Sequence, residues 1–179
     1  MARKLVLKLH QSIDGYICTP QGDVSWIFAD FDDEIARWEV DHLWQAGLHI
    51  MGRGVYEEMA EYWPTSTEPY APPMNEIPKL IFSGSVKSSD WQGTTITSED
   101  LAAKVEELKQ EDGKDILAHG GVRFANSLSR LGLVDEYLLF VHPQALGEGL
   151  PCFSDPASLT LVDVNRFKTG VLVLTYAKK

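Results

Sequence analysis

Hydrophobic and polar residues follow two periods along the chain, and each period predicts one kind of element. Strands are expected where apolar residues alternate or form short runs, at residues 4–11, 48–51, 79–83, 91–97, 115–119, 134–142, 159–167 and 171–176. Apolar residues at helical spacing predict helices between several of these strands, the first with Phe31, Ile35, Trp38 and His42 on one face. This alternation predicts an α/β fold with a mostly parallel central sheet, helices on both faces and an antiparallel C-terminal hairpin.

Polar residues and prolines mark where helices and loops are expected to begin. Asp30 is a suitable N-cap for the first helix, because its carboxylate can accept the free N–H groups of a first turn. Thr97 or Ser98 is expected to cap a later helix in the same way. The proline-rich stretch from residue 65 to residue 78 is predicted to be a loop.

The bulk composition limits the classes of function. A chain of 179 residues is long enough for one α/β domain with its own core. Its 16 basic and 26 acidic residues give a net charge of -10, which argues against a nucleic-acid partner, since phosphate backbones bind basic surfaces. Cys18 and Cys152 are too few for a disulfide framework, and neither the cysteines nor the histidines have metal-ligand spacing. Lys8 interrupts the first apolar run, and no membrane-length apolar span follows, so we expect a cytoplasmic protein with no membrane contact. Because the ligand spacing is missing, we also expect no metal.

Two places in the sequence repeat the order strand, glycine turn, helix start. They are residues 50–55 and 117–124. Glycine lets a backbone approach a phosphate closely, and the free N–H groups at a helix start favour negative charge. Each junction alone is better explained as a tight turn, but two junctions with Arg53 and Arg123 nearby favour a dinucleotide. Arg53 is the better candidate for a 2′-phosphate, because a guanidinium grips phosphate with two hydrogen bonds.

Five short motifs occur in an order that resembles the dihydrofolate-reductase-like proteins. They are residues 9–17, 51–53, 80–83, 119–121 and 141–149, and the last is similar to a motif of the riboflavin-biosynthesis reductase branch. The resemblance covers nearly the whole chain. It implies a single three-layer α/β/α domain, NADPH as the cofactor, a small-molecule substrate and a homodimer.

The resemblance also implies roles for individual residues in holding NADPH. Backbone groups of His10 and Ile17 would hold the nicotinamide carboxamide, and Ser83 and Gly84 would line the adenosine side. The phosphates would lie against residues at the two helix starts, namely Gly52, Arg53, Gly54, Val55, His119, Gly120, Gly121, Val122, Arg123 and Phe124. The Gly120–Gly121 junction is expected to be strained, and a cis peptide bond is considered there. Classical reductases usually have Thr at the position of Val55, so the hydroxyl that binds phosphate is missing here.

The substrate side is less determined by the sequence. Trp26 matches the tryptophan that precedes the pterin-binding carboxylate in dihydrofolate reductases, which puts the expected carboxylate near Asp30 or Phe31. Asp30, Asp32 and Asp33 are equally explained as helix-start charges, and we favour that interpretation, which makes folate reduction doubtful. Asp14 is a substrate candidate that a turn would also explain.

Three functions therefore stand side by side. The first is an NADPH-dependent reductase that passes a hydride to a small heterocyclic substrate and resembles 5-amino-6-(5-phosphoribosylamino)uracil reductase. A dihydrofolate reductase is an alternative within this class. The second is a non-catalytic NADPH-binding homologue, and the third is a dimerisation module. The sequence assigns no proton donor and no catalytic residue.

Overall fold

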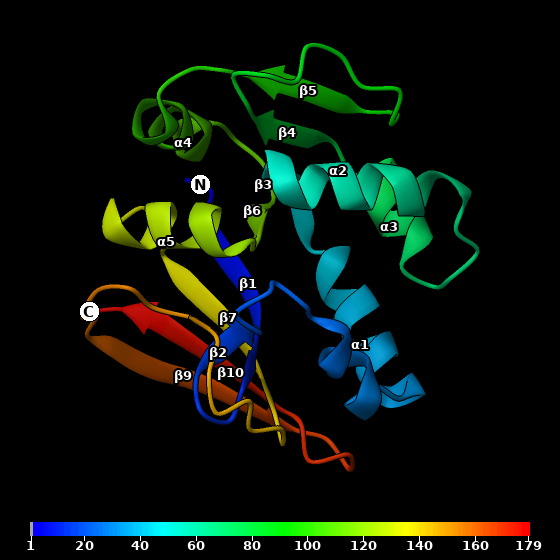
Figure 1. Ribbon diagram of the computed structural model, residues 1–179. Coiled ribbons are helices and arrows are strands. Elements are labelled where there is room, and N and C mark those ends of the chain that lie inside the picture. The colour runs from blue at the N-terminus through cyan, green and yellow to red at the C-terminus, as the bar shows by residue number, and fades with distance from the viewer. Residues whose placement is uncertain (1) are drawn as a thin grey trace.

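The computed structural model describes residues 2–179, and these form one large sheet between two layers of helices (Figure 1). The strands are β1 Leu5–Ser12, β2 Tyr16–Cys18, β3 Ala46–Gly52, β4 Lys79–Phe82, β5 Thr94–Thr97, β6 Asp115–His119, β7 Glu136–His142, β8 Leu150–Pro151, β9 Leu159–Arg166 and β10 Leu172–Lys178. The helices are α1 Asp33–Leu43, α2 Arg53–Tyr62, α3 Ala71–Glu76, α4 Leu101–Gln110 and α5 Val122–Arg130, with 3₁₀ turns η1 Ser25–Asp30 and η2 Trp63–Thr65.

The eight-stranded sheet has the order β5-β4-β3-β6-β1-β7-β10-β9. Neighbouring strands from β5 to β7 pair in parallel, whereas β10 pairs antiparallel with both β7 and β9. The short strands β2 and β8 pair separately, beyond the end of β1. The predicted mostly parallel sheet with an antiparallel C-terminal hairpin is therefore confirmed.

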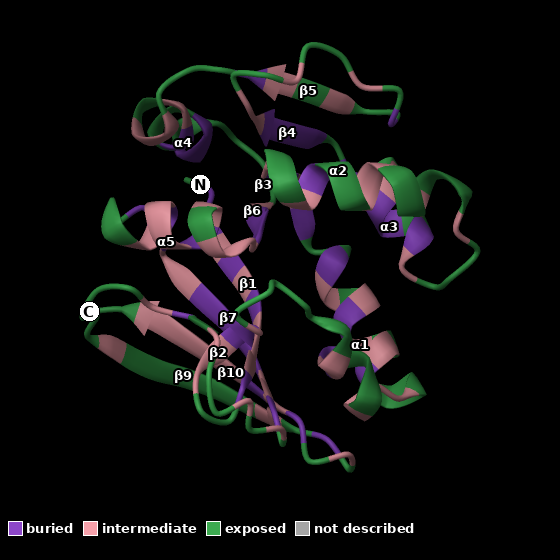
Figure 2. Cartoon of the chain, in the orientation of Figure 1, coloured by how far each residue is buried: buried purple, intermediate pink, exposed green. Residues whose placement is uncertain are grey.

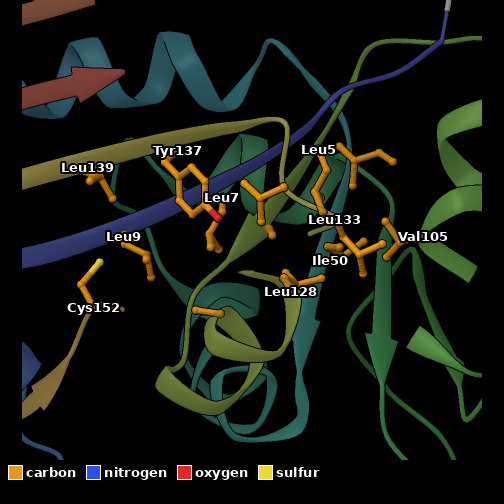
Figure 3. Close-up of a cluster of buried hydrophobic side chains, with 14 of the residues drawn as sticks. Leu5, Leu7, Leu9, Ile50, Val105, Leu128, Leu133, Tyr137, Leu139 and Cys152 are labelled. Atoms are coloured by element: carbon orange, nitrogen blue, oxygen red, sulfur yellow. The ribbon is translucent and has the colours of Figure 1, made fainter. Parts of the chain in front are cut away.

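Both faces of the sheet are buried, which explains the apolar character of its central strands. Leu5, Leu7 and Leu9 of β1 point to one face, where they pack with residues of α4 and α5 such as Val105 and Leu128 (Figure 3). Helices α1 to α3 cover the opposite face (Figure 1). Each fully buried leucine contributes about 1.5–3 kcal/mol to stability, so this double core fixes where the strand ends lie.

The predicted helix caps are wrong by two or three residues. Asp32 caps α1, because its Oδ1 accepts the N–H groups of Glu34 and Ile35 at 3.0 Å each, while Asp30 ends the preceding η1 turn. Asp100 caps α4 through the N–H of Ala103 at 2.9 Å. An aspartate that follows a turn caps better than one within it, because an N-cap needs extended backbone.

The proline-rich stretch is not a loop throughout, because it contains α3. Pro72 lies in the first turn of this helix, where a missing N–H costs no intrahelical hydrogen bond. Lys79, fully buried at the start of β4, donates its Nζ to the carbonyls of Met74, Asn75 and Ile77 at 2.9–3.0 Å. The lysine thereby satisfies carbonyls at the end of α3 and fixes this helix against the sheet.

Candidate functional site

The helices of this protein begin in two different ways. Helices α1 and α4 start on aspartate side chains that accept their first N–H groups. Helices α2 and α5 start on Gly52 and Gly121, which provide no side-chain cap, and neither helix has an acidic residue in its first turn. The first N–H groups of α2 and α5 therefore remain available to an external anion.

The two uncapped helix starts lie against each other at the carboxyl ends of β3 and β6. A Cβ atom on Gly52 would lie 3.2 Å from the Cβ of Phe124, and one on Gly121 would lie 2.8 Å from Cγ2 of Val55. A Cβ on Gly120 would lie only 2.0 Å from Cδ2 of Leu9. These glycines therefore allow β1, α2 and α5 to approach more closely than any side chain would permit.

The expected strain at Gly120–Gly121 is absent. No peptide bond within residues 2–179 is cis, and neither glycine has a positive φ. Gly121 has the extended conformation of an ordinary N-cap, with φ of -114° and ψ of 150°. The prediction of a strained junction was wrong because close packing alone accounts for both glycines.

The space above the first turn of α2 is open and carries positive charge. A Cβ on Gly54 or on Gly84 would meet no atom within 4 Å. The Arg53 side chain is 59% exposed and its Nη1 lies 3.7 Å from Glu57, a weak surface pair that a phosphate can displace. Helix-start N–H groups, an exposed guanidinium and open space together fit the phosphates of a dinucleotide.

Three other residues predicted at the cofactor site have side chains with local roles. The Ser83 hydroxyl accepts the N–H groups of Ser85 and Val86 at 3.2 and 3.0 Å and so shapes the turn after β4. His119 is buried, with its ring 4.7 Å from that of His49 in an edge arrangement. Ile17 packs into the main core. Only the backbones of His119 and Ile17 are therefore available to a ligand.

A second group of polar side chains lies where β1 and β7 end, on the face covered by α1. Nδ1 of His10 and Nε2 of His142 are 3.1 Å apart, so the two imidazoles share a hydrogen bond. His10 stacks on Phe140 with ring centroids 4.5 Å apart, and His142 stacks on Phe31 at 5.9 Å. The aromatic rings leave His142 with no solvent exposure and His10 with 18%.

Trp26 and Asp30, both predicted near the substrate, join this group through His142. The Trp26 ring meets His142 edge-on at 5.4 Å, and Oδ2 of Asp30 lies 3.8 Å from Nδ1 of His142. Gln144 donates a hydrogen bond of 3.1 Å to the same oxygen of Asp30. The favoured interpretation of Asp30 as a helix-start charge is thus wrong, because its carboxylate faces the histidine.

Two buried nitrogens of this group have no partner within the described part of the chain. They are Nδ1 of His142, on a side chain with no solvent exposure, and Nε1 of Trp26. An unsatisfied buried polar atom costs about 1–3 kcal/mol. Both atoms are therefore available to a polar ligand that enters beside Asp30.

The inner side of the group is a buried ion pair. Nζ of Lys8, next to His10 along β1, contacts Oε1 of Glu39 on α1, and the same oxygen lies 3.9 Å from Nε2 of His10. Burial lowers the pKa of Lys8 to about 7. Burial first, and then the neighbouring Lys8 and His142, hold the pKa of His10 well below its ordinary value, so this ring is neutral at pH 7.

Asp14 has a structural role outside both groups. Its carboxylate accepts the Ser12 hydroxyl at 2.6 Å and the N–H groups of Leu146 and Gly147 at 3.2 and 2.8 Å. These contacts lower the pKa of Asp14, the Ser12 hydroxyl most of all. The turn after β1 is thereby tied to the loop after β7, which explains why both motifs occur together.

Sequence reasoning missed Lys8, Glu39, His142 and Gln144. A signal was available: Lys8 and His10 alternate on one face of a strand that is buried on both sides, where apolar residues are the rule. Glu39 lies four residues after Ile35 on the buried face of α1. Polar residues at core-facing positions therefore indicate a functional group there. His142 on β7 could be found only once the order of the strands was known.

Two absences concern residues 2–179. No cluster of three or more His, Cys, Asp or Glu side chains could hold a metal ion there. Within the same range, every helix is too short or too polar to cross a bilayer.

Comparison with known proteins assigns the chain to a family. Residues 3–173 match the family described as RibD C-terminal domain. This chain belongs to that family. It is 31% identical to the uncharacterized protein YyaP of Bacillus subtilis strain 168, over 97% of this chain and 94% of that protein.

Solved structures share the fold of this RibD C-terminal domain. A protein of Shewanella sp. PV-4, whose name assigns it provisionally to riboflavin biosynthesis, matches with a TM-score of 0.75 and 20% identity over 100% of this chain and 99% of that one. The deaminase/5-amino-6-(5-phosphoribosylamino)uracil reductase of Thermotoga maritima matches with a TM-score of 0.69 and 17% identity over 99% of this chain and 57% of that one. The predicted dihydrofolate-reductase-like fold is confirmed.

Proposed function

We propose that this chain is a cytoplasmic NADPH-dependent reductase that transfers a hydride to a small heterocyclic substrate of the ribosylaminopyrimidine kind. The observation that carries the proposal is the pair of uncapped helix starts on Gly52 and Gly121, packed together beside the exposed Arg53. Family membership and the fold shared with a uracil-derivative reductase support the reaction class. The buried free thiols Cys18 and Cys152 support a reducing compartment.

Each half of the site has a task in this reaction. The N–H groups at the starts of α2 and α5 would bind the pyrophosphate, and Arg53 would bind the 2′-phosphate. NADPH, when bound, supplies the hydride. Trp26, Asp30 and His142 would orient the heterocycle at the ends of β1 and β7, where the aromatic rings exclude water.

A titration of the tryptophan fluorescence with NADPH and with NADH tests the cofactor half. We expect NADPH to bind more tightly, and Arg53→Ala to remove about 1.5–3 kcal/mol of binding, the usual value of a hydrogen bond to a charged group. NADH binding should change little, because it lacks the 2′-phosphate. Arg130→Ala, at the far end of α5, is the matched control.

Catalysis needs its own assay, because binding alone also fits a non-catalytic homologue. NADPH oxidation is followed with 5-amino-6-(5-phosphoribosylamino)uracil and, separately, with dihydrofolate. Turnover of the pyrimidine supports the proposal, and turnover of dihydrofolate alone moves the chain to the folate reaction. If neither NADPH nor NADH binds, the proposal is wrong.

We also propose that the protein is a homodimer that pairs through β9. This strand forms one edge of the sheet and is exposed along most of its length (Figure 2). Leu161, Val162 and Val164 are 50%, 58% and 48% exposed. An apolar edge strand that remains uncovered tends to pair with another chain, and a second copy offers an identical edge.

A further inference from the structure

Five ionisable side chains form a continuous line through the substrate half of the site. In order they are Lys8, Glu39, His10, His142 and Asp30. Lys8 contacts Glu39, Glu39 lies 3.9 Å from His10, the two imidazole nitrogens are 3.1 Å apart, and His142 lies 3.8 Å from Asp30. No other hydrogen-bonded pair of histidine rings occurs within residues 2–179.

The five side chains of the line differ in how far they are enclosed. The side chains of Glu39 and His142 are 5% and 0% exposed, whereas those of Lys8, His10 and Asp30 are 13%, 18% and 15% exposed. Apolar rings of Phe31, Phe140 and Trp26 surround the two histidines. A proton on this line is therefore best shielded from bulk water at His142, beside the nitrogens of Trp26 and His142 that lack hydrogen-bond partners.

A hydrogen bond between two neutral imidazoles allows two arrangements of protons. In the first, His142 holds a proton on Nδ1, facing Asp30, and its Nε2 accepts the Nδ1–H of His10. In the second, His142 donates its Nε2–H to Nδ1 of His10, whose single N–H lies on Nε2, facing Glu39. Moving from the first arrangement to the second carries one proton from the Glu39 side to the Asp30 side.

We propose that His10 and His142 relay a proton from the Lys8–Glu39 pair to the substrate atom beside Asp30. The inference rests on the proposed reductase function, because hydride transfer to a C=N or C=O bond leaves a nitrogen or oxygen that must gain a proton. The sequence assigned no proton donor, and this line of side chains supplies one.

The relay conserves protons and electrons at every step. The hydride from NADPH brings two electrons to the carbon atom of the substrate double bond, and the electron pair of the double bond moves to the nitrogen or oxygen. That atom takes the proton from Nδ1 of His142, or from Asp30 after its transfer there. His142 Nε2 takes the proton of His10 Nδ1, and His10 Nε2 takes one from Lys8 through Glu39, which leaves Lys8 as a neutral amine until solvent reprotonates it.

The charges around the relay permit this direction of transfer. The ionisable groups that face His10 are Lys8, Glu39, His142 and His119, which lies on the neighbouring strand β6. Those that face His142 are His10 and Asp30. Burial lowers the pKa of both relay histidines and of Lys8, while the Asp30 charge raises that of His142. Lys8 can therefore release a proton near neutral pH.

Imidazole nitrogen NMR on the free protein tests the relay without any substrate. We expect a scalar coupling across the hydrogen bond between Nδ1 of His10 and Nε2 of His142. Asp30→Asn should change the ratio of the two ring tautomers in His10, although Asp30 contacts only His142 of the pair. Asp33→Asn, an exposed aspartate one turn along, is the matched control and should leave His10 unchanged.

Two results would overturn the relay. One is the absence of the coupling, and the other is a His10 tautomer ratio that does not respond to Asp30→Asn while His142 responds. Asp30→Asn keeps the shape of a side chain that is already partly exposed, so the variant is expected to fold. The double variant with His142→Gln should abolish any remaining response at His10.

An activity measurement separates the relay from the proposed function. With 5-amino-6-(5-phosphoribosylamino)uracil as substrate, Asp30→Asn should lower kcat about 100-fold, the lower range for a lost general acid. NADPH affinity should be unchanged, and the acidic limb of the pH–kcat profile should move. Equal kcat values in both proteins would overturn the relay. If the wild-type chain turns over no substrate, the reductase proposal fails, and the NMR result still decides the relay.

Discussion

The two halves of the site are built from different parts of the polypeptide. The half at the ends of β3 and β6 consists mainly of backbone, with N–H groups of α2 and α5 brought together at glycines where a Cβ would crowd a neighbouring side chain. The half at the ends of β1 and β7 consists of side chains from four separate elements. Backbone suits a phosphate, which is the same in every nucleotide, whereas side chains can be matched to one substrate.

The largest expected effect is a loss of folding stability in acid, and histidines of both halves contribute to it. The histidines of the substrate half, and His49 and His119 beneath the phosphate half, are buried with lowered pKa values, and burial lowers that of His49 to about 3. Below pH 6.5 the unfolded chain binds protons that the folded chain excludes. Stability is therefore complete above pH 6.5 and falls by about 1.4 kcal/mol per pH unit for each such histidine as the pH decreases.

Urea unfolding between pH 8 and pH 4 measures this loss. His49→Phe keeps an aromatic ring against His119 and removes two buried nitrogens that lack partners among the described residues. We expect this variant to be at least as stable at pH 8, and to take up about one proton fewer on unfolding in acid. An unchanged slope would mean that His49 becomes protonated in the folded protein.

A single glycine substitution should break the phosphate half while leaving the substrate half intact. Gly121→Val places its side chain against Val55, where a Cβ alone would lie 2.8 Å from Cγ2, and so separates the starts of α2 and α5. We expect a loss of about 1–3 kcal/mol of stability, as for other overpacked sites, and at least tenfold weaker NADPH binding by calorimetry.

The control for this change is another glycine of the same half. Gly54 faces open space, so Gly54→Ala should raise stability by roughly 0.5–1 kcal/mol through better helix propensity. The His10–His142 coupling should persist in Gly121→Val, because that pair belongs to the other half. Equal stability losses in both glycine variants would contradict the close-packing role of Gly121.

The smallest expected effect on stability lies at the edge of the sheet, outside both halves. Val164→Lys places a charge on β9, where the native side chain is 48% exposed, so monomer stability should change by less than about 0.5 kcal/mol. The same change should convert the proposed homodimer to a monomer in sedimentation analysis. Lys168→Ala, in the turn beyond β9, is the control. A wild-type monomer would contradict the proposed dimer.

The sequence predicts the two glycine junctions but not the imidazole pair, and the reason is the distance between residues along the chain. Gly52–Arg53 and Gly120–Gly121 each occupy one continuous strand-to-helix junction, so a local pattern was sufficient. His10 and His142 are 132 residues apart and meet only because β1 and β7 pair in parallel. No local pattern contains that pairing.

The errors in secondary structure have local causes of the same kind. The prolines of α3 predict a loop, although proline is well tolerated in a first helical turn. Several aspartates compete for the start of α1, and only the backbone angles decide that Asp32 is the cap. The mostly parallel character of the sheet and its two covered faces are predicted by apolar periodicity, whereas the strand order is not.

The uncapped starts of α2 and α5 leave helix N–H groups without a side-chain hydrogen bond in the folded protein. A helix cap is commonly worth about 1 kcal/mol, and here those positions are left for a ligand to fill. A ligand that binds only the folded chain raises its stability by about 2.7 kcal/mol at a concentration of 100 times its Kd. A ligand that binds these helix starts should therefore raise the melting temperature of the protein. A panel of nucleotides, differing in their phosphates alone, would rank the true cofactor without any knowledge of the reaction.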